Sequence, residues 1–290
     1  MFSLETKTLR IVRSPKVRSS LESANTARRR RILGYIGTGT GVVIGGPSFW
    51  TSSANARTKT PHPEKAEIES LFTSSYQWDD ESPVTQENME RLDEADDENF
   101  YDEPKLVEHI DEAAVSALTS FHEKELKNVA ARMRKSSKEL RVLDLCSSWV
   151  SHLGDWAKKG SDTANMALAD HTVQNLNTQT ALGFEEGAFD CVLCQLSIDY
   201  LVNPTAVIKE ALRTLSPGGE LIITFSNRVF FTKAVALWTG KSDLEHLETV
   251  GNYIHFSGAP AVKKIEAFDI LPSASRSGGD PLYAVIAEKS

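Results

Sequence analysis

Cysteine is scarce in this chain, and long hydrophobic runs are missing from most of it. Three cysteines in 290 residues exclude a disulfide-rich scaffold. With 17 glycines and 11 prolines, the chain is neither collagen-like nor of low complexity. The absence of repeated apolar stretches of about 18 residues excludes a polytopic membrane protein. What remains is 40% hydrophobic and 25% charged residues, a composition typical of a globular protein.

Positive charge is concentrated at the N-terminus. Residues 1–56 hold nine Lys and Arg against two Glu, a net charge of +7, whereas the rest holds 23 basic against 38 acidic side chains, a net charge of −15. The acidic body argues against a nucleic-acid partner, because phosphate contacts need a basic face. The opposite signs indicate that residues 1–56 have a separate role.

Residues 1–56 have the composition of a targeting sequence. Residues 1–31 are rich in Arg, Ser and Thr, and they end in a basic run ahead of 25 uncharged residues that close with Ala54-Asn55-Ala56. This is the signal-peptide pattern, and the paired arginines also fit a twin-arginine signal. The two parts resemble bipartite presequences. We therefore expect import into the chloroplast and on to the thylakoid, with the mitochondrion as the alternative address.

Two other interpretations of this region stay open. Twenty-five uncharged residues are long enough to span a bilayer, although six glycines and Pro47 make a poor helix. The run Arg28–Arg31 also fits nuclear localisation or RNA binding. Under the presequence interpretation, the membrane is met only through residues 1–56, and the mature chain begins near Arg57.

Residues 57–104 are acidic and carry little periodic apolar pattern. Between Asp79 and Glu112, fifteen Asp and Glu are accompanied only by Arg91 and Lys105. Such a segment buries too little apolar surface to offset its ordering entropy, so we expect a largely disordered linker. Apolar residues then recur at helical spacing, and residues 105–290 are expected to form one folded domain.

The domain alternates predicted helices and strands. Two helical stretches precede a strand in LRVLDLCSS, and a helix from Pro204 to Leu215 separates the strands FDCVLCQLS and ELIITFS. The final strands, KIEAFDIL and PLYAVIAEK, have a Ser-, Gly- and Pro-bearing connection that favours an antiparallel pair. Strands alternating with helices predict an α/β sheet whose ligands sit at the carboxyl ends of the strands.

Three segments, taken in order, resemble a known family. They are VLDLCSSWVSHL at Val142–Leu153, the segment Phe189–Asn227 with its Phe-Asp strand start and its Leu-Ser-Pro-Gly-Gly turn, and the closing FDIL and GGDPLYAVIAEK. The second resembles class I S-adenosylmethionine-dependent methyltransferases of the type 11 kind, and the first resembles a subgroup with a DLCSSW signature. The resemblance implies a Rossmann-like class I methyltransferase sheet with a C-terminal antiparallel strand pair. It also implies S-adenosyl-L-methionine as cofactor and a small-molecule or lipid-like acceptor.

The resemblance places the cofactor at the end of the first domain strand. In the family, an acid there precedes a glycine-rich turn that lets the backbone lie against the cofactor. Asp144 matches the acid, whereas Cys146, Ser148 and Val150 stand where the family has glycines. Serine hydroxyls and backbone amides can still bind the methionine carboxylate. Asn175 stands where the family has an Asp that accepts from the adenine amino group. The candidate cofactor-binding residues are Asp144, Cys146, Ser147, Ser148 and Asn175.

A further departure lies between Leu153 and Val173. The family has a second strand there, ending in an acid that accepts from the ribose hydroxyls. Here the segment is short and weakly strand-like, and Asp162 and Asp170 are its only later acids. These departures leave open an alternative, a methyltransferase-fold protein that has lost its cofactor and serves as a binding or assembly module.

Candidate catalytic and substrate-binding residues follow the strands. Asp199 can act as a general base when its pKa is tuned, and Tyr200 can stack on a substrate; a loop Asp and a packed Tyr are the alternatives. Arg228 can bind an anionic group through its planar guanidinium. Trp149 and His152 either line the pocket or begin a packed helix. The candidate substrate-binding residues are Trp149, His152, Asn227 and Arg228.

Cys191 and Cys194 form a C-x-x-C motif inside a predicted strand. Side chains three apart on a strand face opposite sides. We therefore expect buried core cysteines and predict no metal site.

Overall fold

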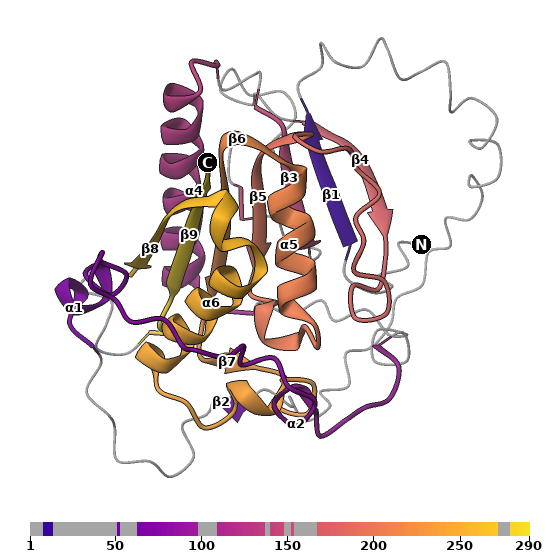
Figure 1. Cartoon of the computed structure of the whole chain (residues 1–290), viewed down its shortest axis with the longest axis vertical. Coiled ribbons are helices and arrows are strands. Elements are labelled where there is room, and N and C mark those ends of the chain that lie inside the picture. Colours follow the sequence, from indigo (N-terminus) through magenta and orange to yellow (C-terminus); the bar gives the residue numbers. More distant parts are fainter. Residues whose placement is uncertain are drawn as a thin grey trace, which may run out of the picture.

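The computed structural model describes residues 8–13, 51–52, 63–97, 109–136, 140–147, 152–153, 167–271 and 279–290. A seven-stranded sheet lies at its centre (Figure 1). In spatial order, its strands are β4 (Ala167–Val173), β1 (Thr8–Arg13), β3 (Val142–Ser147), β5 (Phe189–Gln195), β6 (Leu215–Phe225), β9 (Tyr283–Lys289) and β8 (Val262–Asp269).

Three long helices cover the sheet, with α5 (Pro204–Thr214) and α6 (Asp243–Gly258) on one face and α4 (Glu112–Arg132) on the other (Figure 1). Among the described residues, no helix combines the length and the apolar composition needed to cross a membrane. The shorter elements are β2 (Thr51–Ser52) paired with β7 (Arg228–Val229), α1 (Lys65–Glu69), α2 (Gln86–Met89), η4 (Ile198–Tyr200), η5 (Ala236–Trp238) and η6 (Ala259–Ala261).

Capping residues mark where the helices begin. The Asn203 side chain accepts from Ala206 N at 3.2 Å ahead of α5, and the Asp111 carboxylate accepts from Ala114 N at 2.8 Å ahead of α4. Each cap satisfies an amide that the first helical turn leaves without a partner. The structure has one helix, α4, where the sequence predicts two helical stretches, because neither glycine nor proline interrupts residues 112–132.

The central strands are buried on both faces. Val192 and Cys194 of β5 join the core under α5 and α6, whereas Cys191 and Leu193 join the core under α4. The prediction that the two cysteines are buried on opposite sides is therefore confirmed.

The strand directions confirm the predicted fold class. Strands β3, β5 and β6 run parallel, and β9 pairs antiparallel with β8, as expected for the two C-terminal strands. Strand β9 also pairs antiparallel with β6. Strand β6 begins at Leu215 and so includes the residues predicted as a turn. Its Gly219 lies so close to the neighbouring strand that a Cβ would stand 2.8 Å from Asp190 O.

The N-terminal strand β1 lies between β3 and β4. It pairs antiparallel with both, placing Thr8 opposite Ser147 of β3 and opposite Val173 of β4. Strand β1 therefore occupies the place beside β3 where the family resemblance calls for a second strand. Both β1 and β2 fall within residues 1–56, whose role as a presequence stays a prediction, as do the boundaries of the three predicted segments.

Residues 63–97, here called the strap, contact the domain. Ile68 and Met89 are buried, and Trp78 stacks between Phe72 at 5.3 Å and His255 of α6 at 4.7 Å between ring centroids. From its composition, this segment is expected to be part of a largely disordered linker. The difference arises because a few apolar and aromatic side chains anchor the strap. A prediction based on the acidic composition of the segment gives these few side chains no weight.

Candidate active site

The carboxyl end of β3 carries the first candidate residues. Its side chains are all buried, and Cys146 has a φ of 56°. This left-handed conformation costs roughly 1 kcal/mol for a residue with a Cβ but nothing extra for glycine. The end of β3 therefore has, at Cys146, the left-handed backbone that a glycine adopts without cost.

Asp144 is fixed by the neighbouring strand. Gln195 Nε2 of β5 donates to Asp144 Oδ1 at 2.8 Å, and both side chains are buried. The bond ties the ends of β3 and β5 together and orients the Asp144 carboxylate.

Several buried polar atoms lie near this turn in sequence or on the adjacent strand. Within the described residues, Ser147 Oγ, Gln195 Oε1 and His152 Nδ1 have no hydrogen-bond partner. Leaving such groups unpaired is costly. Their chemistry includes a hydroxyl donor and a carbonyl acceptor, which fits the amino-acid end of S-adenosylmethionine with its carboxylate and ammonium groups. The described residues thus fit the predicted cofactor at this end.

His152 is neutral at neutral pH. Burial, and secondarily the positive charge of His109, lower the pKa of His152 to about 4. Its backbone oxygen contacts His122 Nδ1 of α4 at 3.2 Å, and burial lowers the pKa of His122 to about 4 as well. His152, which follows β3 in the chain, is therefore held against α4 by a contact between two residues whose imidazoles are uncharged.

Asn175 begins the loop after β4 and borders a cavity of about 730 Å³. Its Oδ1 accepts from Asn177 N at 3.0 Å, a turn that asparagine commonly forms with the backbone two residues on. A carbonyl oxygen has a second lone pair, so Asn175 can still accept from a ligand.

The two candidate catalytic residues lie in η4, directly after β5. The Tyr200 hydroxyl accepts from Phe230 N at 2.8 Å, which holds the ring in place. Asp199 is only 3% exposed. Burial, with the Asp199 charge, raises the pKa of Tyr253 of α6, which places these two groups within electrostatic reach.

Asn227 and Arg228 follow β6. Arg228 Nη1 lies 3.5 Å from Asp280 Oδ1, while Asp280 N donates to Asp111 Oδ2 at 2.7 Å. The guanidinium is therefore already engaged by the segment that precedes β9. Because β3, β5 and β6 are parallel, Ser147, η4 and Arg228 follow strand ends on the same edge of the sheet. Ser148 and Trp149 lie outside the described residues.

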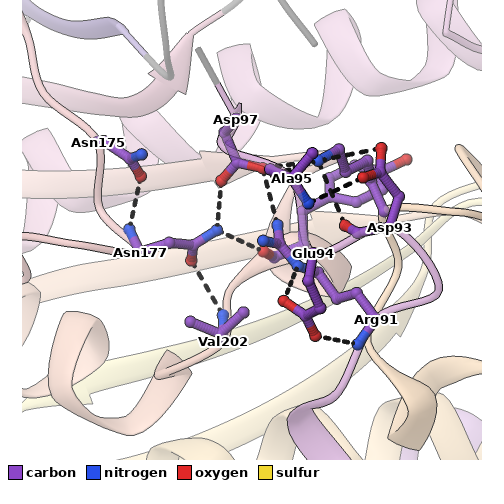
Figure 2. A network of polar contacts seen from close by, with 10 residues as sticks. Arg91, Asp93, Glu94, Ala95, Asp97, Asn175, Asn177 and Val202 are labelled. Atoms are coloured by element: carbon purple, nitrogen blue, oxygen red, sulfur yellow. Dashed lines mark hydrogen bonds and ion pairs between the residues drawn. The ribbon is translucent and has the colours of Figure 1, made fainter. Parts of the chain in front are cut away.

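One set of residues at this edge is not predicted as part of the site from the sequence. Figure 2 shows Asp97 of the strap, itself bound by Arg91, in contact with Asn177, which lies two residues after Asn175 in the loop after β4. The signal was present in the sequence, since Arg91 stands almost alone as a base in the acidic segment. Spacing by itself does not connect it to a loop more than 80 residues away.

Comparisons with known proteins identify the middle of the chain. Residues 124–223, about a third of the chain, match the family model described as a methyltransferase domain. The ubiquinone biosynthesis O-methyltransferase of Xanthomonas oryzae pv. oryzae is 34% identical over 68 residues, which cover 23% of this chain and 28% of that protein. The chain thus spans under a third of the length of the curated relative it matches.

Solved structures with a similar segment include two methyltransferases. A possible histamine N-methyltransferase from Thermotoga maritima has a TM-score of 0.29 and 17% identity, covering 41% of this chain and 62% of that one. Geranyl diphosphate C-methyltransferase from Streptomyces coelicolor A3(2) has a TM-score of 0.25 and 13% identity, covering 41% and 52%.

Residues 124–223 thus match a methyltransferase domain of the type 11 kind, and the sheet that includes part of this segment is of the mixed α/β, Rossmann-like type. The comparison confirms S-adenosyl-L-methionine as the cofactor of this class of domain.

Proposed function

We propose that this chain is an S-adenosylmethionine-dependent methyltransferase acting on a small-molecule or lipid-like acceptor. The observation that carries the proposal is the end of β3, where Cys146 keeps the left-handed backbone and Ser147 Oγ is buried without a hydrogen-bond partner among the described residues. A cofactor that hydrogen-bonds Ser147 removes the cost of this unpaired hydroxyl.

The proposed donor site uses residues from β3 and from the loop after β4. Asp144, oriented by Gln195, provides negative charge, and Ser147 provides a hydroxyl donor. When bound, the cofactor supplies an electrophilic methyl group on a sulfonium. The proposed donor residues are Asp144, Cys146, Ser147, Ser148 and Asn175.

The proposed acceptor side is formed by the residues after β5 and β6. Such transfer depends mostly on proximity and alignment, so a rigid Tyr200, held by Phe230 N, suits a positioning role. Asp199 accepts a proton if the acceptor loses one. Asn227, Arg228, Trp149 and His152 complete the proposed acceptor site. A small-molecule acceptor is in keeping with the name of the curated relative, a ubiquinone biosynthesis O-methyltransferase. We also propose that the chain belongs to the subgroup with the DLCSSW signature.

One observation favours a second function, a binding or assembly module without catalysis. Asn175 Oδ1 is engaged by its own loop, and side chains stand at all three family glycine positions. Both features reduce the room and the hydrogen-bonding capacity for a nucleoside.

Calorimetry on the full chain separates the two functions. We expect S-adenosylhomocysteine to release measurable heat, Ser147→Ala to weaken its binding by roughly five- to tenfold through loss of one hydrogen bond, and Cys191→Ser, which lies under α4, to leave the affinity unchanged. Absence of heat and of any thermal shift at millimolar ligand would overturn the enzyme proposal in favour of the binding module.

We also propose the chloroplast, with the thylakoid as final compartment, as the destination, and the mitochondrion as the alternative. N-terminal sequencing of the protein from isolated organelles should give a start near Arg57. A chain beginning at Met1 in those organelles contradicts cleavage.

A further inference from the structure

The strap follows α6 and is anchored there by two specific contacts. The Phe72 ring fits against Gly251, where a Cβ would stand 2.3 Å from the ring. Further along, Asn252 Nδ2 donates to Asp79 Oδ2 at 2.7 Å. These contacts fix the path of the strap before it reaches the carboxyl edge of the sheet.

The end of the strap is held by a buried cation. The Lys233 side chain is 4% exposed, and its Nζ donates to Ala95 O at 2.6 Å and lies 3.2 Å from Asp93 Oδ2. Lys233 Nζ also lies 3.6 Å from Asp97 Oδ1, which accepts from Arg91 Nη1 at 2.8 Å. Two cations therefore converge on one oxygen of Asp97, which fixes the carboxylate.

The other oxygen of Asp97 reaches the candidate site. Asn177 Nδ2 donates to Asp97 Oδ2 at 2.8 Å and to Tyr200 O at 3.0 Å, while Asn177 Oδ1 accepts from Val202 N at 3.0 Å (Figure 2). Both N–H groups of the Asn177 side-chain amide and its oxygen are therefore engaged in hydrogen bonds. Asn177 joins the loop after β4 to the turn after β5, and Asp97 holds Asn177 in that orientation.

The same contacts build a cavity with two walls. Its volume is about 730 Å³; Met89, Arg91 and Asp97 of the strap line one wall, and Asn175 and Val202 line the other. Asn175 is the residue proposed to accept from the adenine amino group, so this cavity adjoins the nucleoside end of the proposed donor site.

We propose that the strap completes the nucleoside pocket of the methyl donor and that Asp97 is its positioning residue. This inference rests on the proposed function. It assigns part of the donor site to residues that precede the matched methyltransferase segment, which begins at residue 124.

The chemistry of the cavity suits a nucleoside. Ribose hydroxyls and the adenine amino group are donors, and the lining offers carboxylate and amide acceptors, with Asp96, Asp97 and Asn175 among them. Strand β1 runs antiparallel to β3, with Thr8 opposite Ser147. The carboxyl end of β1 therefore lies at the opposite edge, away from the site, and an acid at that end cannot serve the ribose. The strap brings carboxylates to the pocket instead.

Two ligands and three variants of the full chain test the proposal by calorimetry. The ligands are S-adenosylhomocysteine and 5′-methylthioadenosine, which has the nucleoside end without the amino acid. We expect Asp97→Ala to weaken both ligands by the same factor, about tenfold, because Asn177 loses the charge-assisted hydrogen bond that orients the loop beside the nucleoside. Ser147→Ala should weaken S-adenosylhomocysteine alone, since it acts at the amino-acid end.

Asp93→Asn is the matched control. Asp93 also pairs with Lys233 in the strap, but it is not among the partners of Asn177, so we expect both affinities to stay within about twofold. If Asp97→Ala lowers the melting temperature so far that binding cannot be measured, Asp97→Asn takes its place. Wild-type affinity for both ligands that survives either Asp97 variant, or that falls equally in Asp93→Asn, overturns the inference and leaves the proposed function intact. Failure of the wild type to bind either ligand overturns the proposed function itself.

Discussion

The sheet has two sides that this chain builds differently. On the β6 side (β5, β6, β9 and β8), each observed strand overlaps the sequence pattern that predicts it, although β6 begins earlier, at Leu215. The last two strands, β8 and β9, pair antiparallel as expected. On the β3 side (β3, β1 and β4), a strand from the N-terminus separates β3 from β4. The β6 side carries the proposed acceptor residues of η4 and β7, and the β3 side carries the turn proposed for the donor.

The difference teaches where the chain departs from its relatives. The scaffold below the proposed acceptor residues follows the pattern of the family that the sequence resembles, whereas the side proposed for the donor has side chains at the positions of family glycines. In our proposal, that side also uses residues that precede the matched segment. If so, the two sides should respond differently to substitution, to pH and to truncation.

The largest effect is expected at the junction where β5 meets the other central strands. Asp190 is fully buried and pairs with Lys135 Nζ at 2.8 Å and Arg141 Nη2 at 3.0 Å, and it also accepts from the Ser216 hydroxyl of β6. Asp190→Asn leaves both cations without their counter-charge. These cations are about 30% exposed, so water partly replaces the lost partner. We therefore expect the free energy of unfolding in urea to fall by about 3 kcal/mol, the low end for breaking a buried ion pair.

Glu210→Gln is the control for that substitution. Glu210 forms a comparable pair with Arg213 at 2.8 Å, but both side chains are partly exposed, so the loss should stay below about 1 kcal/mol. Equal losses in the two variants contradict the view that the buried junction holds the β6 side together.

The same contrast explains what the sequence can and cannot predict. Strand β5 is predictable because a strand buried on both faces is a continuous apolar run, and the β8–β9 pair follows from two strands joined by a turn-rich connection. Asp144 and Ser147 can be placed at a strand end from the sequence because they stand at the end of one continuous apolar run. The insertion of β1 and the contact between Asp97 and Asn177 join distant segments, and neither periodicity nor local spacing encodes such pairings.

Counted for each residue involved, a smaller effect than that of Asp190→Asn is expected from acid on the β3 side. His122 and His152 have pKa values lowered to about 4, against about 6.5 when unfolded. Between these values the unfolded chain binds more protons, so stability is full above pH 6.5 and falls as the pH drops toward 4. Each group should cost about 2 kcal/mol at pH 5. His122→Asn should flatten the pH dependence of urea unfolding, and an unchanged slope would show that His122 is not the titrating group.

The smallest effect on global stability is expected from removing β1. A chain that begins at Arg57 loses β1 and β2, and with β1 the hydrogen bonds to both β3 and β4. Strand β4, at the edge of the sheet, is left without its partner and opens locally without global unfolding, so we expect the free energy of unfolding to change by less than about 1 kcal/mol. Hydrogen exchange should instead be faster at the β4 amides and unchanged in β5 and β6. Faster exchange throughout β5 and β6 would mean that the N-terminal strand supports the whole sheet, and the distinction between the two sides would fail.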